Sequence, residues 1–152
     1  MTGSVSDRPE VLVTRLANGD GLPLPSPATH GSAGSDITSA DDLTLGPGER
    51  KLVHTGLAVA IPEGYEIQVR PRSGLALNHG ITLVNTPATI DSDYRGELMI
   101  AMINLGSAAF AITRGMRIAQ LIVSRVERPV FVAVDALPLS RRGDGGFGST
   151  GL

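Results

Sequence analysis

Between residues 52 and 61 the sequence alternates from one residue to the next, with a large apolar or β-branched side chain at every second position. These positions are Val53, Thr55, Leu57, Val59 and Ile61. A period of two residues is typical of a β-strand that turns one face toward a hydrophobic core. A second alternating segment, residues 65–70, follows after a turn at residues 62–64. We therefore expect the two segments to form a β-hairpin.

Further short strands are expected along the chain, separated by turns rich in glycine, proline, asparagine and aspartate. They cover residues 11–16, 81–84, 98–104, 110–113, 118–123 and 129–134. The 19 glycines and 10 prolines among 152 residues supply the turns that so many strands need. Several short strands at this spacing are typical of an all-β sandwich or barrel, and the length suits a single domain.

One short helix is expected between these strands. Ser73 is a favourable N-cap, residues 75–78 favour a helix, and Gly80 is a typical stop. Arg72 stands directly before the helix, where its guanidinium would add to the free N–H groups of a helix N-terminus and attract an anion such as phosphate. An ordinary capped turn between two strands explains the same residues equally well.

Composition and charge exclude several classes of protein. With no cysteine, the chain has neither disulfides nor thiolate-based zinc sites. Its single lysine, Lys51, follows no glycine-rich loop, which rules out a P-loop nucleotide-binding site. The formal net charge of −2 offers no general attraction for nucleic acid, and no apolar run approaches the ~20 residues of a membrane span. We expect a soluble cytoplasmic protein without nucleic-acid or membrane partners.

Two further segments each have two interpretations. The tail from residue 140 is rich in glycine, so it is either a mobile terminus or a strap that lays Phe147 on a flat ligand. In the strap, Arg142, Ser149 and Thr150 would contact phosphates. Asp91 and Asp93 lie in a bend before an apolar strand, where a carboxylate either bonds the local backbone or deprotonates a water molecule.

Five segments, taken in order, resemble the motifs of the trimeric dUTP pyrophosphatases, the dUTPase family. They are residues 33–39, 71–81, 85–97, 114–122 and 142–151. The resemblance implies a β-clip, which is a distorted jelly roll, assembled as a threefold homotrimer with active sites at the subunit contacts. Residues 1–139 would then form the β domain, and residues 140–152 a flexible lid that completes an active site.

The family's reaction is the hydrolysis of dUTP to dUMP and pyrophosphate, which limits uracil in DNA and supplies dUMP for thymidylate synthesis. By this resemblance Asp91 is the general base that activates the water attacking the α-phosphorus. The phosphates would be held by residues of the second, fourth and fifth motifs. These are Arg72, Ser73, Gly74, Gln120, Arg142, Gly148 and Ser149.

The resemblance also implies how the nucleoside is recognised. Asn85 and the backbone of Thr89 and Ile90 would bind uracil in a hairpin between residues 84 and 91. Tyr94 would pack beneath the deoxyribose, Met99 would line the same pocket, and Phe147 would stack on the base. The other three aromatic residues, Tyr65, Phe110 and Phe131, are then left for packing.

Mg²⁺ is the cofactor that the resemblance implies, bound to the triphosphate with Asp36 as an outer-sphere partner through water. Hard oxygen ligands suit this ion. The three histidines, His30, His54 and His79, are expected to be structural or solvated.

The sequence departs from the family pattern at two positions. Asn78 stands where Lys or Arg is common, and Ala88 where Gly is common. The related dCTP deaminases need a glutamate at the position of Ala101 and lack the glycine-rich tail, which argues against that activity. A non-catalytic, nucleotide-binding regulator would lack Asp91 or the tail, and both are present.

Overall fold

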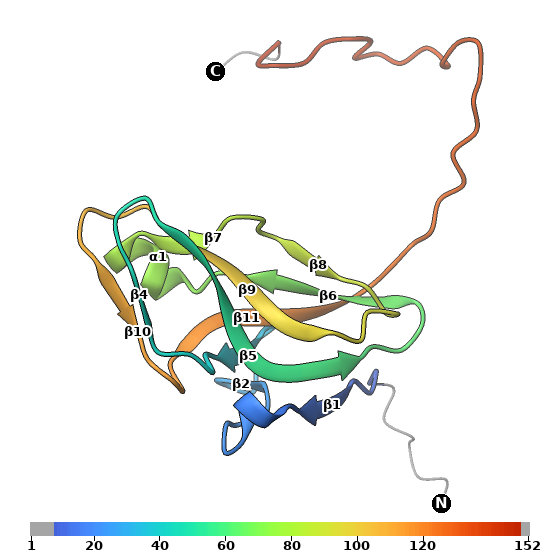
Figure 1. Cartoon of the computed structure of the whole chain (residues 1–152). Helices are drawn as coiled ribbons and strands as arrows, with labels where there is room; N and C mark the ends of the chain where they lie inside the picture. Colours follow the sequence, from blue (N-terminus) through green and yellow to red (C-terminus); the bar gives the residue numbers. More distant parts are fainter. Residues whose placement is uncertain (1–7, 150–152) are drawn as a thin grey trace, which may run out of the picture.

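The computed structural model describes residues 8–149 (Figure 1). Thr150 and Gly151, which belong to the fifth motif, lie outside this range. The strands and helices are β1 Leu12–Arg15, the 3-10 helix η1 Ala17–Gly19, β2 Ser26–Pro27, β3 Ser35–Thr38, β4 Leu43–Leu45, β5 Arg50–Ala60, β6 Tyr65–Arg70, α1 Ser73–His79, β7 Ile81–Leu83, β8 Ala88–Ile90, β9 Glu97–Asn104, β10 Phe110–Ile112 and β11 Arg117–Arg125.

The strands form two main sheets around one hydrophobic core, which confirms the all-β prediction. One sheet has the order β1-β5-β9-β7, the other β2-β3-β11-β6-β8, and β4 pairs with β10 at one end. The core takes side chains from both sheets, among them Val53 and Ile100 from the first and Ile67 and Leu121 from the second. Within residues 8–149 the only α-helix has seven residues, and no helix there is long and apolar enough to cross a membrane.

The predicted hairpin between residues 52–61 and 65–70 is wrong. β5 pairs with β1 and β9, whereas β6 pairs with β11 and β8 in the other sheet. The turn after Ile61 carries the chain from one sheet to the other, so Val53 and Ile67 reach the same core from opposite sides. The alternation identified two strands with one buried face each, but this pattern is the same for strands in one sheet or in two.

The segment between residues 84 and 91 is likewise not a paired hairpin. β7 pairs with β9 in the first sheet, and β8 pairs with β6 in the second. Val84 donates its N–H to the carbonyl of Ala101 at 2.9 Å, which continues the pairing of β7. The segment therefore bridges the two sheets and brings the residues after β8 to the side of the molecule where β9 begins.

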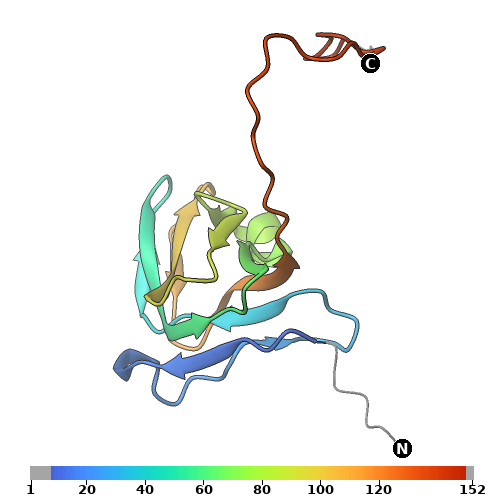
Figure 2. The same ribbon diagram turned by 90° about the vertical axis from the view of Figure 1, so that its right-hand side faces the viewer.

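The predicted strand at residues 129–134 does not form. After β11 ends at Arg125, the chain leaves the two sheets and extends away from them in both views (Figures 1 and 2). Phe131 is 93% exposed, so its predicted packing in the core is also wrong. β11 already pairs with β3 on one side and β6 on the other, which leaves no free edge beside it for another strand of this chain. We call residues 126–149 the C-terminal arm.

The predicted helix is present, but it begins differently. Arg72, not Ser73, is the N-cap residue of α1, with extended backbone and no side-chain cap. Gly80 ends the helix as predicted, with a positive φ of 69° and its N–H bonded to the carbonyl of Ala76 at 3.0 Å. Arg72 therefore lies at the junction between the end of β6 and the helix, where its side chain is free to turn toward β3.

Candidate active site

The bend after β8 forms one wall of a pocket of about 250 Å³, which we call the Asp91 pocket. Its lining residues are Leu52, Thr89, Ile90, Asp91, Tyr94, Glu97 and Met99. The structure thus brings together five of the residues expected to bind the nucleoside or to activate water. Asp91 comes directly after β8 and is exposed, so its carboxylate is accessible to a ligand and to solvent.

The bend itself is closed by short hydrogen bonds. The N–H of Tyr94 donates to the carbonyl of Asp91 at 3.1 Å. The guanidinium of Arg95 donates from Nη1 to the carbonyls of Ser92, at 2.6 Å, and Tyr94, at 2.9 Å. These local bonds hold together the backbone of the bend that carries Asp91 and Tyr94.

The side chain of Tyr94 lies against the backbone at the start of β9. Its hydroxyl donates to the backbone carbonyl of Glu97 at 2.9 Å, and a Cβ built on Gly96 would lie 2.6 Å from the ring carbon Cζ. Only glycine leaves room for the ring there. Tyr94 and Met99 remain 40% and 37% exposed, which gives the pocket an accessible apolar surface.

A second pocket, of about 320 Å³, lies between β3, β11 and the start of α1, and we call it the Arg72 pocket. Its lining residues are Ala28, Ser32, Ala33, Gly34, Asp36, Arg72, Ser73, Gly74 and Gln120. Gln120 donates from Nε2 to the carbonyl of Pro71 at 2.9 Å, which ties β11 to the segment before the helix. The pocket combines a guanidinium, a hydroxyl, an amide and backbone N–H groups, a set of donors that suits phosphate oxygens.

Asp36 is the acidic group of this pocket and is held by two arginines. Its Oδ1 lies 3.3 Å from Nε of Arg72, and its Oδ2 lies 3.0 Å from Nη1 of Arg117. Two guanidinium groups leave some of the four lone-pair positions of a carboxylate free for water. Within residues 8–149 no group of three or more His, Cys, Asp or Glu side chains is placed to hold a metal ion.

The two pockets share no lining residue. β8 is an edge strand, and β6 lies between it and β11, so β8 and β11 are about 10 Å apart at a spacing of about 4.8 Å per strand. The structure therefore brings the predicted site residues together as two groups, not one. Asn85 is exposed and lines neither pocket.

The tail residues of the predicted site stand apart from both pockets. In Figures 1 and 2 the C-terminal arm points away from the sheets, and Phe147 is fully exposed. Nε of Arg142 donates to the carbonyl of Gly145 at 2.7 Å, and the N–H of Ser149 donates to the carbonyl of Gly146 at 3.0 Å. Within this chain, the hydrogen bonds of Arg142 and Ser149 in the arm are local ones.

Two charged residues at these pockets were not among the predicted site residues. Arg117 pairs with Asp36, and Glu97 lines the Asp91 pocket. Both lie inside the motifs described above, so their positions in the motifs could have indicated that they belong to the site. What the sequence did not contain is the pairing of β11 with β3 and of β9 with β5, which gives each side chain its neighbours.

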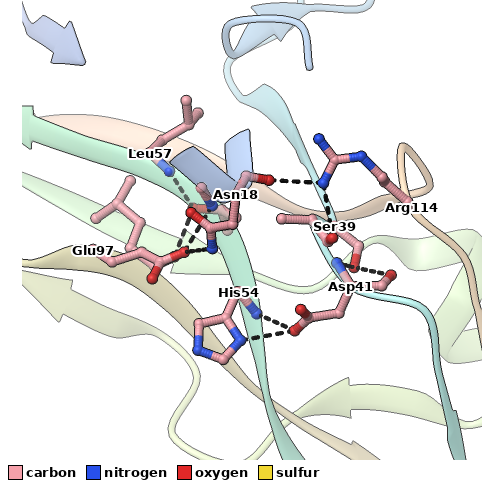
Figure 3. A network of polar contacts seen from close by, with 11 residues as sticks. Asn18, Ser39, Asp41, His54, Leu57, Glu97 and Arg114 are labelled. Carbon is pink, nitrogen blue, oxygen red and sulfur yellow. Dashed lines mark hydrogen bonds and ion pairs between the residues drawn. The ribbon is translucent and has the colours of Figure 1, made fainter. Parts of the chain in front are cut away.

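A polar network lies beside the Asp91 pocket and joins β5, β9 and the N-terminal segment (Figure 3). Asp41 Oδ2 accepts from the backbone N–H of His54 at 2.8 Å and lies 2.9 Å from its Nδ1. The hydrogen bond with Asp41 raises the pKa of His54 above its usual value. His79 instead stacks on Phe110, with ring centroids 4.8 Å apart. Both contacts agree with the structural roles expected for these histidines.

Comparisons with known proteins give one consistent result. A family model described as dUTPase matches residues 20–151. The chain is 59% identical over 140 residues to a deoxyuridine 5'-triphosphate nucleotidohydrolase of Zymomonas mobilis, covering 92% of this chain and 96% of that protein. A protein of the same name from Rhizobium etli is 52% identical over the full length of both.

The fold agrees with solved structures as well. The dUTPase of Staphylococcus bacteriophage 80alpha with dUpNHpp superimposes with a TM-score of 0.85 at 28% identity, covering 94% of this chain and 99% of that one. The sequence motifs, the all-β fold and a family match over most of the chain all agree. The chain belongs to the dUTPase family.

Proposed function

We propose that the protein hydrolyses dUTP to dUMP and pyrophosphate. The observation that carries the proposal is the content of the two pockets. One presents an accessible carboxylate, Asp91, beside the flat ring of Tyr94, and the other presents Arg72 with donors suited to phosphates. Relatives that are more than half identical over nearly the whole chain are named deoxyuridine 5'-triphosphate nucleotidohydrolases, which supports the same substrate.

In the proposed reaction Asp91 is the general base. An ionised carboxylate orients a water molecule and takes its proton as the water oxygen attacks the α-phosphorus. The bond between the α-phosphorus and its bridging oxygen then breaks, and pyrophosphate leaves with the electron pair. The exposure of Asp91 supports this role, because the attacking water must reach it from solvent.

The triphosphate would lie in the Arg72 pocket. Arg72 presents charge, Ser73 and Gly74 present hydroxyl and backbone donors at the start of α1, and Gln120 presents an amide. Such groups stabilise the charge that develops on the phosphate oxygens and on the leaving pyrophosphate. The ion pair between Asp36 and Arg72 holds the guanidinium toward this pocket before the ligand arrives.

The nucleoside would occupy the Asp91 pocket. Tyr94 and Met99 form an apolar surface for the deoxyribose, and the backbone of Thr89 and Ile90 offers groups for the edge of uracil. Asn85 is exposed and lies outside the pocket in this chain, so its contact with uracil would require the ligand or another subunit to bring it closer.

Mg²⁺ would be bound by the triphosphate, with Asp36 contacting it through water. When bound, the ion neutralises phosphate charge and polarises the phosphate oxygens. Asp36 suits an outer-sphere role because its two arginine partners leave lone pairs for water, and no cluster of metal-binding side chains lies within residues 8–149.

We further propose that three copies assemble around a threefold axis. Leu52 and Val84 are each 51% exposed, Leu52 in β5 and Val84 directly after β7, the two strands of the first sheet that flank β9. The C-terminal arm exposes a second apolar set, consisting of Val130, Phe131, Val132, Val134, Leu137, Leu139 and Phe147. Exposed apolar surface of this kind is typical of an interface between subunits. The arm would cross to a neighbouring copy, where residues 140–152 would close over the bound nucleotide.

No partner other than nucleotide and further copies of the chain is proposed. A phosphorylated nucleotide substrate belongs to the cytoplasmic pool, and we place the enzyme there.

A substrate panel tests the proposed reaction. The full chain is incubated with Mg²⁺ and with dUTP, dCTP, dTTP or UTP, and both pyrophosphate release and base identity are followed. We expect pyrophosphate from dUTP and little from the other three. Uracil nucleotide formed from dCTP would instead indicate a deaminase, and no product from dUTP would overturn the proposal.

The lid is tested by truncation after Ser140. The shortened chain keeps every strand of both sheets, so we expect it to fold and assemble but to lose most of its kcat/KM for dUTP. An unchanged rate would show that residues beyond Ser140 do not take part.

A further inference from the structure

Glu97 opens β9 immediately after the bend that carries Asp91 and Tyr94. We propose that Glu97 is a positioning residue that fixes Tyr94, and through it determines the preference for deoxyribose over ribose. The inference rests on the proposed function, which assigns Tyr94 to the sugar. Glu97 accepts a hydrogen bond from Tyr94 with its backbone carbonyl, and its side chain accepts one from β5.

The side chain of Glu97 ties the start of β9 to β5. Its Oε1 accepts from the backbone N–H of Gly56 and from Nδ2 of Asn18, each at 2.8 Å. The regular pairing of β5 with β9 is interrupted between His54 and Ala58. Gly56 lies in that interruption, so the carboxylate supplies the acceptor that a paired strand would otherwise provide.

Gly56 is itself held firmly in place, which makes it a fixed anchor. Its carbonyl accepts from the N–H of Leu16 at 2.8 Å, and it has a positive φ of 69°. Gly19 packs so close to it that a Cβ on Gly56 would lie 2.9 Å from the carbonyl carbon of Asn18. The position of the Glu97 carboxylate is therefore set by the N-terminal segment and β5 together.

The backbone of Glu97 holds Tyr94. The tyrosine hydroxyl donates to the Glu97 carbonyl at 2.9 Å, and the ring lies over Gly96. Tyr94 is 40% exposed and is not among the side chains that pack against the hydrophobic core. A shift of Glu97 would move the acceptor of the tyrosine hydroxyl and change the height of the ring in the Asp91 pocket.

A surface can distinguish deoxyribose from ribose only if it lies very close to the sugar. Rejection of a ribose 2′-hydroxyl needs a ring close enough that the extra oxygen has no room, and small displacements in such sites have large kinetic effects. Glu97 lines the same pocket but is bonded to Gly56 and Asn18. Its effect on the reaction is therefore expected through Tyr94 rather than through contact with the phosphates.

The experiment compares four variants in a Tyr65→Phe background. The chain has no Trp and two Tyr, so in this background Tyr94 is the only source of the near-ultraviolet tyrosine circular dichroism band. Glu97→Ala removes the carboxylate that accepts from Gly56 and Asn18 but keeps the backbone carbonyl that accepts from Tyr94. Glu97→Gln keeps a side-chain oxygen that can accept the same two bonds, and Asn18→Ala removes one of them. Arg15→Ala is the matched control, because it removes a bond to the carbonyl of Leu22 in the same N-terminal segment without touching Glu97.

We expect Glu97→Ala to reduce the ratio of kcat/KM for dUTP to that for UTP by about tenfold and to weaken the Tyr94 band. Glu97→Gln should restore both, and Arg15→Ala should leave both unchanged even where it lowers the melting temperature. Asn18→Ala, an exposed change, should shift both in the same direction as Glu97→Ala by a smaller amount, and it serves if Glu97→Ala does not fold.

An unchanged ratio and band in Glu97→Ala, or an equal change in Arg15→Ala, would overturn the inference. Failure of the proposed function looks different, because the parent chain would then not hydrolyse dUTP at all. In that case the tyrosine band of the variants still tests whether Glu97 fixes Tyr94.

Discussion

The carboxylate of Asp91 lies at the accessible side of its pocket, one residue beyond β8. Changing it to Asn keeps the size of the side chain but removes its ability to take a proton. We expect Asp91→Asn to lower kcat for dUTP by about 10²–10⁴-fold, the usual contribution of a general base. Binding of a non-hydrolysable imido analogue of dUTP, measured by calorimetry, should change little.

Asp93 provides the matched control for this prediction. It lies in the same bend and is also exposed, but it does not line the pocket that contains Tyr94 and Met99. Asp93→Asn should retain most of the activity. If the two variants lost activity equally, the base could not be assigned to Asp91.

Protonation of His54 is expected to make the free energy of unfolding depend on pH. Its hydrogen bond with Asp41 raises its pKa above 6.5, and burial opposes this only in part. Since the folded pKa lies above the unfolded one, the added stability is fully present below pH 6.5 and is lost as the pH rises through the folded pKa. The stability difference between the wild type and His54→Gln should therefore shrink from pH 5.5 to pH 8.5 in denaturant titrations. A nuclear magnetic resonance titration that gave His54 a pKa below that of a free histidine would contradict this.

At the scale of elements, the sequence predicted strands and the helix better than it predicted their neighbours. The alternation at residues 52–61 and 65–70 identified β5 and β6, because each strand has one buried face. It could not show that they lie in different sheets, since a tight turn serves a hairpin and a crossing between sheets alike. The same limit applies to β7 and β8.

Residues 129–134 were predicted as a strand for a related reason. Valine and phenylalanine favour extended backbone whether or not a partner strand is available. In this chain the neighbours of β11 are already β3 and β6, so the segment stays extended and exposed. Local sequence has the same limit for the site residues. The motifs named most of them, but the strand order that separates Asp91 from Arg72 is not a local property of the sequence.

The position of α1 depends on a close backbone contact with the β9–β10 connection. A Cβ on Gly106 would lie 3.2 Å from the carbonyl carbon of His79 and 3.1 Å from Oδ1 of Asn104. We expect Gly106→Ala to push the helix outward and so displace Arg72 at its other end. The KM for dUTP should rise, and overpacking should destabilise the fold by about 1–3 kcal/mol, seen as a lower melting temperature.

Gly46→Ala is the control for this change. A Cβ there meets only the Glu49 side chain, at an ordinary 3.7 Å. This variant should keep the wild-type KM and melting temperature. If Gly106→Ala lowered the melting temperature without raising the KM, the contact would stabilise the fold but would not position the phosphate-binding end of the helix.

At the scale of the whole molecule, the isolated chain has two separate pockets and an arm that reaches neither. The Asp91 pocket lies at the β8 edge of the second sheet, whereas the Arg72 pocket lies at β3 and β11. In a closed ring of three copies, each contact can join the Asp91 pocket of one subunit to the Arg72 pocket of the next. The arm can then come from the third subunit. The proposed trimer thus accounts for both the separation of the pockets and the exposed apolar arm.

Mixing two inactive chains tests this arrangement directly. Asp91→Asn chains retain a working Arg72 pocket, and Arg72→Ala chains retain a working Asp91 pocket. In trimers assembled from equal amounts of both, a site that joins two different subunits is intact in about one case in four, so about a quarter of the wild-type activity per site should return. If each site were built within one chain, no mixture could recover activity. Co-expression of differently tagged chains, followed by tandem affinity purification, gives the mixed trimers. A parallel mixture of Asp91→Asn with the Asp91→Asn, Arg72→Ala double variant should stay inactive, because no subunit in it supplies the base.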